Sequence, residues 1–377
     1  MAVTAAPRLK LTGICPPARG AVVSAVVRAR PDAPAWIVVV DELKEAEQLA
    51  EDIAFFQNAA QSGCEVLVLP EAMPDSRDMR EAFAASADRT TVLSRLRATR
   101  TAGAPPLVAV TTPTALLQSV PALEAFATRE MTLAAGQGHA FAGLLEQLHA
   151  LDYDSESVCE SPGHYAVRGG IIDVYPITAT QPYRLDFFGD VIEEIRGFDP
   201  VTQRSGEKVA SITITASPRL KLEAARTGIA DYLPKGTHLM FIEPASLDEE
   251  FSLFAREGDA TPEGGSPVLP AILARCGAVI GLGDLDEAAA LFEGPDVQEA
   301  TWDTESLRHH RSFPDDSLVA QERLQVEADA RSRFLQQLMT WKKAGSRIVF
   351  VVSKEAEEQR VRGLLEEESG LKSLKPE

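Results

Sequence analysis

The sequence contains few cysteines, and they lie far apart. Cys15, Cys64, Cys159 and Cys276 are the only four in 377 residues, and no Cys-x-x-Cys pair occurs. This spacing argues against a zinc ribbon and against a small disulfide-bonded scaffold. We therefore expect reduced thiols in a cytoplasmic protein.

Long apolar runs and an excess of basic residues are also absent. No run approaches the roughly 18 residues of a membrane span, and no N-terminal stretch resembles a signal peptide. The formal net charge is −19, and such a chain repels the phosphate backbone of nucleic acids. We expect a soluble, cytoplasmic chain with no membrane partner and no broad nucleic-acid surface. The net charge does not rule out a local basic patch. The acidic excess can also serve solubility alone.

Recognisable catalytic and metal-binding motifs are missing as well. The sequence has no Gly-x-Ser-x-Gly elbow and no His-Glu-x-x-His. The pair His309-His310 stands beside arginines, and His164 has no carboxylate or cysteine at ligand spacing. The sequence therefore predicts no catalytic residues and no metal site.

One stretch near the N-terminus occupies the place of a phosphate loop but lacks the residues of one. A working loop reads Gly-x-x-x-x-Gly-Lys-Ser/Thr, with a lysine for the phosphate charge and a hydroxyl for Mg²⁺. Counting from Gly13, the last three positions are Ala18, Arg19 and Gly20. Pro16 and Pro17 remove two more N–H donors. The stretch is either an ordinary strand-to-helix turn or the relic of a nucleotide site, and we expect no bound ATP, although Arg19 could still meet an anion.

Apolar runs that alternate with helical patterns predict an α/β fold with a parallel sheet. Runs at 35–40, 65–69 and 107–111 precede the middle of the chain, and runs at 237–242 and 276–281 follow it. A last run at 347–352, with a helix after it, predicts the start of a further α/β domain. One strand and one helix cannot bury their own apolar faces, so we expect the chain to end inside that domain.

The middle of the chain has a different pattern. Short β-rich runs at 165–168, 171–175, 183–188 and 191–198 are separated by Gly169-Gly170, by a segment rich in proline and threonine, and by Gly189-Asp190. Such runs predict an antiparallel meander with one buried face and one free face. Asp173, Asp186 and Asp190 could form a carboxylate cluster, but in this setting we expect them to pair with arginines or to cap turns.

This meander resembles the UvrA-binding module shared by UvrB and by the bacterial transcription-repair coupling factors. The matching stretches are 162–173, 183–190, 195–196, 198–199 and 202–204. His164 departs from the family, which usually has glutamate at that position. The lost phosphate loop, and the absence of tyrosine from 68–97 where UvrB has a tyrosine-rich hairpin, favour the N-terminal region of the coupling factors.

The resemblance implies a helicase-like, degenerate NTPase domain of parallel-sheet type, formed by 1–140 and 218–312. The UvrA-binding module at 141–217 interrupts it, and 313–377 begin an incomplete α/β domain. It also implies UvrA as the partner, in transcription-coupled nucleotide excision repair. RNA polymerase and DNA would be reached only through domains absent from this chain, which in the family include an ATP-dependent DNA translocase.

Family members dock UvrA through arginines and an aromatic residue on the free face, and the matching positions are Arg168, Arg184 and Phe188. Residues 184 and 188 share one face of a regular strand, so Leu185 and Phe187 are expected on the buried face. Arginines suit carboxylates of a partner, and an exposed aromatic is a typical anchor. Arg196 and Arg204 are weaker candidates.

Two alternatives stay open for this face. Arg168 and Arg184 could pair internally with Asp173 or Asp186 instead of with a partner. If they serve docking, Arg184→Glu or Phe188→Ala is expected to weaken UvrA binding and to leave the fold intact.

Three functions are compatible with the sequence. The first is a non-catalytic module that recruits UvrA to lesion-stalled RNA polymerase. The second is a UvrB-type, ATP-dependent, helicase-like subunit for damage verification, against which the missing lysine and hydroxyl argue. The third is a structural domain whose meander merely resembles the UvrA-binding module.

Overall fold

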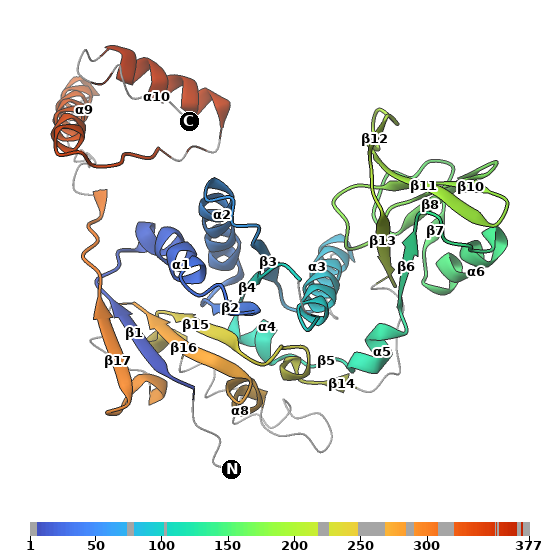
Figure 1. Cartoon of the computed structure of the whole chain (residues 1–377). Coiled ribbons are helices and arrows are strands. Elements are labelled where there is room, and N and C mark those ends of the chain that lie inside the picture. Colours follow the sequence, from blue (N-terminus) through green and yellow to red (C-terminus); the bar gives the residue numbers. More distant parts are fainter. Residues whose placement is uncertain are drawn as a thin grey trace. The chain divides into compact units, whose positions relative to one another are not determined.

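The computed structural model describes most of the chain in two compact units, Met1–Thr304 and Glu305–Glu377. The residues it describes are 6–73, 79–101, 104–217, 226–247, 268–283, 290–307, 320–350, 352, 354–367 and 371. His309 and His310 lie outside them. The elements of each unit are labelled in Figure 1.

A seven-stranded sheet in which all pairings are parallel forms the centre of the first unit. Its order is β17-β1-β16-β15-β2-β4-β3. The strands are β1 (Arg8–Thr12), β2 (Ala35–Val39), β3 (Glu65–Leu69), β4 (Leu107–Thr111), β15 (Thr237–Ile242), β16 (Cys276–Leu282) and β17 (Val297–Thr301). Four strands precede residue 112 and three follow residue 236, so segments far apart in sequence complete one sheet. The prediction of an α/β fold with a parallel sheet is confirmed.

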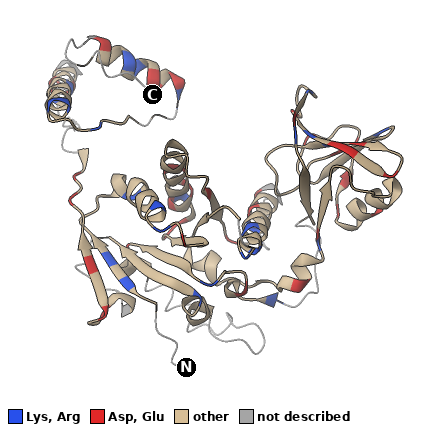
Figure 2. Ribbon diagram, viewed as in Figure 1, with Lys and Arg blue, Asp and Glu red and all other residues tan. Residues whose placement is uncertain are grey.

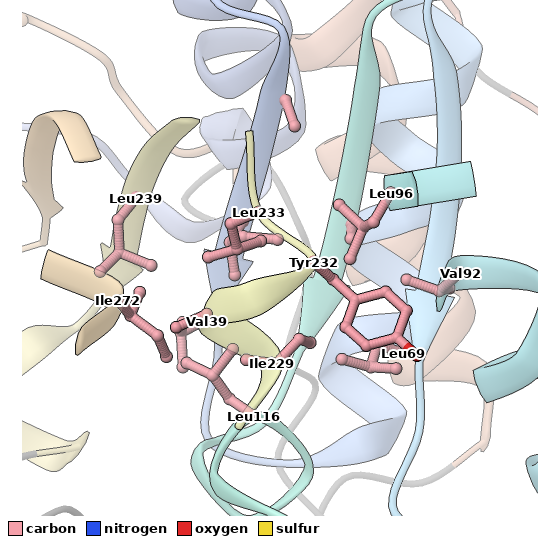
Figure 3. Packing of buried hydrophobic residues seen from close by; sticks show 14 of the residues in the cluster. Val39, Leu69, Val92, Leu96, Leu116, Ile229, Tyr232, Leu233, Leu239 and Ile272 are labelled. Carbon is pink, nitrogen blue, oxygen red and sulfur yellow. The ribbon is translucent and has the colours of Figure 1, made fainter. Parts of the chain in front are cut away.

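Helices cover both faces of this sheet, which explains why β2 is apolar at every position. Trp36 and Val38 pack with residues of α1 (Arg19–Arg28) and α2 (Leu43–Ala59). Ile37 and Val39 face the opposite core, which includes Tyr232 (Figure 3). The remaining helical segments of this part are η1 (Pro16–Ala18), α3 (Met79–Ala98), α4 (Pro113–Leu117), α5 (Leu123–Ala127), η2 (Ile229–Asp231), α8 (Val268–Leu273) and η3 (Ala290–Phe292).

A six-stranded, mainly antiparallel sheet follows in the middle of the chain and is called the module sheet below. Its order is β12-β11-β10-β9-β8-β7, with only β7 and β8 parallel. The strands are β7 (Asp154–Ser155), β8 (His164–Arg168), β9 (Ile171–Val174), β10 (Tyr183–Phe188), β11 (Val191–Phe198) and β12 (Ser205–Lys208). The predicted meander corresponds to β8 through β11, and the edge strands were not predicted.

One face of the module sheet is buried, and we call it the inner face. Leu185, Ile172 and Ile195 pack there with Leu144 and Leu148 of α6 (Phe141–Ala150). Two strand pairs connect the module sheet to the rest of the unit: β6 (Glu130–Ala134) with β13 (Ser211–Thr215), and β5 (Val120–Pro121) with β14 (Arg226–Thr227).

Helix α3 takes part in two hydrophobic cores of the first unit. Its residues Phe83 and Ala87 pack against the core below the module sheet. Its later residues, among them Val92 and Leu96, belong to a core of the parallel sheet. Near its end, Ser94 donates a 2.5 Å hydrogen bond to Glu130 on β6, and Arg97 forms an ion pair with the same carboxylate.

The second unit contains two helices, α9 (Ala320–Lys343) and α10 (Glu355–Glu367), among its described residues. Leu338 and Leu365 form its small core, with Ile348 against it. The strand predicted at 347–352 is not formed by residues 347–350, and Val349 is 51% exposed. The physical reason is that no described residue of this unit lies in a strand with which the run could share hydrogen bonds. That 313–377 begin a further α/β domain stays a prediction.

Candidate functional site

The face of the module sheet opposite the inner face is called the outer face, and its residues follow from the strand register. Arg184 on β10 lies opposite Asp173 on β9 and Arg196 on β11. Asp173 in turn lies opposite Ala166 on β8. Because opposed residues point to the same side of a sheet, these side chains form one row. Further members of the face include Arg168, Ile171, Asp186, Phe188, Val191, Glu194, Phe198 and Lys208.

Arg184 is held by a buried carboxylate in the middle of this face. Its Nε donates to Asp173 Oδ1 at 2.7 Å, and its Nη2 donates to Asp173 Oδ2 at 2.8 Å. The Asp173 side chain is 1% exposed, and the Arg184 side chain 17%. The guanidinium carbon lies 4.8 Å from the centre of the Phe198 ring, as in a cation–π contact. The alternative of internal pairing is therefore what is observed for Arg184.

The ion pair with Asp173 changes the pKa of Arg184. The hydrogen bond to Asp173 raises the pKa of the Arg184 guanidinium above its ordinary value, and partial desolvation opposes that shift. Cys159, Ala166 and Phe198 form a small cluster beside the pair. Burial, and next the charge of Asp173, raise the pKa of the Cys159 thiol to about 12. Cys159 is thus a neutral, structural thiol, as expected for the cysteines of this chain.

Phe188 and Arg168 are the exposed members of the predicted site. Phe188 is 76% exposed and lies opposite Val191, which is 41% exposed. Arg168 is exposed, and its Nη2 donates to the Ser157 carbonyl at 3.2 Å. Leu185 is fully buried and Phe187 packs on the inner face, as the alternation along β10 predicted.

The hairpin that carries Phe188 is anchored at its tip. The Asp190 carboxylate accepts the Phe141 backbone N–H at 3.0 Å, at the start of α6. The Asp190 carbonyl accepts the His139 N–H at 2.6 Å, and Val191 forms an isolated β-bridge with Gly138. The Asp190 side chain therefore caps the start of α6, and not a turn as predicted, and this contact anchors the hairpin from which Phe188 projects.

Arg196 takes part in a separate ion-pair network on the same face. Its Nη2 donates to Glu194 Oε2 at 2.7 Å, and Lys208 Nζ on β12 lies 3.0 Å from the same oxygen atom. Hydrogen bonds from Arg196 lower the pKa of Glu194. Acidic and basic residues thus alternate on the module strands, and Figure 2 shows both colours there.

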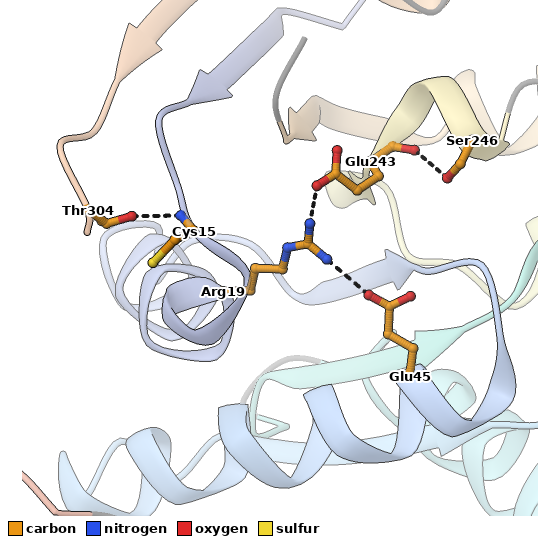
Figure 4. Close-up of polar contacts among 6 residues, drawn as sticks. All are labelled: Cys15, Arg19, Glu45, Glu243, Ser246 and Thr304. Carbon is orange, nitrogen blue, oxygen red and sulfur yellow. Dashed lines mark hydrogen bonds and ion pairs between the residues drawn. The ribbon is translucent and has the colours of Figure 1, made fainter. Parts of the chain in front are cut away.

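The predicted phosphate-loop residues extend from the end of β1 into the first turn of α1, where Arg19 meets two carboxylates (Figure 4). Arg19 Nη1 donates to Glu45 Oε1 of α2 at 3.1 Å, and Nη2 forms an ion pair with Glu243, just after β15. The Arg19 side chain is 14% exposed. Arg19 thus lies near the carboxyl ends of the parallel strands, where α/β proteins bind ligands. Its partners there are two carboxylates of the chain itself.

The backbone of this loop is also engaged within the chain. The Cys15 N–H donates to Thr304 Oγ1 at 2.7 Å, and that hydroxyl donates to the Gly13 carbonyl at 3.0 Å. Gly13 has φ +69°, and a Cβ at this position would overlap the Trp302 carbonyl oxygen. Gly20 lies against Asp52 of α2, without room for a side chain. Both glycines are thus required by close packing in this chain.

Other kinds of site are not evident in the part of the chain that the structure describes. Within it, no group of three or more His, Cys, Asp or Glu side chains could hold a metal ion. No described helix is long and apolar enough to span a membrane. His164 has no metal-ligand neighbours of this kind, and its Nδ1 is buried without a hydrogen-bond partner.

Comparison with known proteins identifies the module. Residues 131–219 match the model of the UvrB interaction domain. This match spans the whole module sheet, β13 and all of β6 except Glu130.

Curated relatives of the chain include several transcription-repair coupling factors. The one from Myxococcus xanthus is 31% identical over 264 residues, which are 67% of this chain and 21% of the relative. That from Bacillus subtilis is 32% identical over 134 residues, covering 36% of this chain and 11% of the relative. The coupling factor from Staphylococcus aureus (strain USA300) is 36% identical over 95 residues, which are 25% of this chain and 8% of the relative. The chain thus spans about a fifth or less of these curated relatives, and its recognition as similar to the N-terminal region of such proteins is confirmed.

Proposed function

We propose that this chain is a non-catalytic docking region that recruits UvrA through the outer face of its UvrB interaction domain. The observation that carries the proposal is Phe188, an aromatic side chain 76% exposed on an anchored hairpin. Exposed aromatic side chains on rigid backbone are typical centres of protein interfaces, since little entropy is lost when they are buried. Arg168 at the same end of the sheet adds a cation for an acidic partner.

The test is a binding titration of the chain with UvrA from the same organism. Phe188→Ala is expected to weaken binding by about thirtyfold or more, the effect of removing an aromatic anchor of about 2 kcal/mol. Val201→Ala is the matched control, because Val201 is 89% exposed on the same module but lies beyond the opposite end of β11. Equal affinity of the unaltered chain and Phe188→Ala would contradict the proposed docking face.

We further propose that the loop at Arg19 binds no nucleotide. Glu45 and Glu243 neutralise the arginine, so a triphosphate would have to displace two carboxylates and then bind beside them. A calorimetric titration of the chain with Mg²⁺-ATP is expected to show no saturable heat of binding. Saturable, Mg²⁺-dependent binding would instead favour a UvrB-type ATP-dependent subunit.

The longer relatives suggest the setting in which such docking would act. Their name implies coupling between transcription and repair, and the resemblance implies an ATP-dependent DNA translocase elsewhere in such a protein. We propose that RNA polymerase and DNA are partners of those other regions, and that the described module serves UvrA alone.

A further inference from the structure

The guanidinium of Arg184 is constrained on one edge and one face and is free on its other edge. Asp173 occupies the edge formed by Nε and Nη2, and the Phe198 ring lies against one face. Among the described residues, no second acceptor is hydrogen-bonded to this guanidinium. The edge formed by Nη1 and the remaining Nη2 hydrogen is therefore available to a carboxylate in the bidentate geometry that arginine favours.

Asp173 itself cannot contact a partner. Its side chain is 1% exposed and lies between Ala166 and Arg184 in the row that crosses the outer face. Its two oxygens both accept from Arg184, so the carboxylate determines the plane and the direction of the guanidinium. A partner that approaches this face meets an arginine whose orientation is already set, and little rotamer entropy remains to be lost.

We infer that Asp173 is a positioning residue of the docking face, which holds Arg184 so that its free edge binds a carboxylate of the partner. This inference rests on the proposed docking of UvrA. It assigns a binding role to a residue that touches no partner, and it specifies the chemistry of the contact: an aspartate or glutamate side chain that binds Arg184 in a bidentate manner.

Substitution by asparagine separates positioning from bulk. Asp173→Asn keeps the size of the side chain, but an amide has one acceptor oxygen, and its NH₂ group would direct N–H donors at the donors of the guanidinium. The variant therefore loses the bidentate hydrogen bonding between residue 173 and Arg184. Asp186 provides the matched control: it lies on the same face, two residues from Arg184, and influences Arg184 only through its charge. Asp186→Asn removes one negative charge near the same arginine without removing a hydrogen bond to it.

The experiment is a double-mutant cycle in the complete chain, with affinity for UvrA as the readout. It uses Asp173→Asn, Arg184→Gln and the double variant, in which two neutral amides replace the ion pair, so that no buried charge is left alone. Asp173→Asn is expected to weaken binding on the order of tenfold in the presence of Arg184 and to have no effect in the Arg184→Gln background. Asp186→Asn is expected to leave the affinity within about twofold of the unaltered chain. Circular dichroism of each variant verifies that the titrated protein is folded.

Each outcome bears on a distinct statement. Equal effects of Asp173→Asn with and without Arg184 would overturn the positioning role, and so would an Asp186→Asn effect as large as that of Asp173→Asn. If Phe188→Ala still weakens binding as expected in those cases, the proposed docking of UvrA stands and only the inference about Asp173 fails. If the unaltered chain does not bind UvrA, both fail together.

Discussion

Replacement of Arg184 by glutamate is expected to lower the free energy of unfolding of the module by about 3–5 kcal/mol, the usual cost of leaving a buried charge without its partner. Asp173 is 1% exposed, and both of its oxygens accept hydrogen bonds from Arg184. Arg184→Glu would put a second carboxylate beside it. Chemical unfolding followed by circular dichroism measures the effect. The sequence suggested that this variant would bind less UvrA with an intact fold, and the burial of Asp173 changes that expectation.

The control for this prediction is Arg196→Glu. Arg196 lies on the same row of the outer face, but its side chain is 37% exposed and its partner Glu194 is 21% exposed. Water can solvate the charges left by that substitution, so the unfolding midpoint is expected to change little. Equal midpoints for Arg184→Glu and the unaltered chain would show that Asp173 does not depend on its ion pair. Binding losses measured with Arg184→Glu must therefore be interpreted together with its stability, whereas Phe188→Ala acts on an exposed side chain.

The second large effect is expected at Gly13, where alanine should destabilise the first unit by about 2–5 kcal/mol. Part of this value is the left-handed backbone, which costs a residue with a Cβ about 1–2 kcal/mol. The rest is the overlap of that Cβ with the Trp302 carbonyl oxygen, since forced overpacking typically costs about 1–3 kcal/mol. The loop would have to move away from the segment that follows β17. Thermal or chemical unfolding of the complete chain measures the change.

Gly63→Ala isolates the backbone part of that effect. Gly63 has φ +68°, nearly the same as +69° at Gly13, and a Cβ there would meet nothing within 4 Å. Its substitution is expected to cost about 1–2 kcal/mol. If both alanine variants lose the same stability, the contact with Trp302 is unimportant and Gly13 is required only for its backbone angle. A larger loss at Gly13 identifies the loop between β1 and α1 as a structural junction.

The periodic features of the chain could be predicted from the sequence, because they depend on local patterns. The apolar run at β2 predicted a strand buried on both faces, and alternation along β10 placed Leu185 and Phe188 on opposite faces. The turn at Gly189-Asp190 was predicted from its place between two strands, whereas the bond from the Asp190 carboxylate to the start of α6 was not. The family resemblance then directed attention to three residues on one face.

The polar partners could not be predicted, because they come from distant parts of the chain. Arg19 meets Glu45 and Glu243, and no sequence pattern links those positions. Whether Arg184 pairs with Asp173 or with Asp186 depends on strand register, and both pairings were open. The apolar run at 347–352 predicted a strand, but residues 347–350 form none, because a strand also requires a neighbouring strand for its hydrogen bonds.

Helix α3 has a consequence for what counts as the docking domain. The segment that matches the family model begins at residue 131, yet Phe83 and Ala87 pack against its core, and Ser94 and Arg97 bind Glu130. A boundary drawn from sequence similarity would therefore cut through a shared core, and it would remove Glu130, the first residue of β6, together with the α3 side chains that bind it. The hydrophobic core of the docking domain therefore extends beyond the segment that is recognised by sequence similarity. The sheet that carries Phe188 packs against residues about a hundred positions before it in the chain.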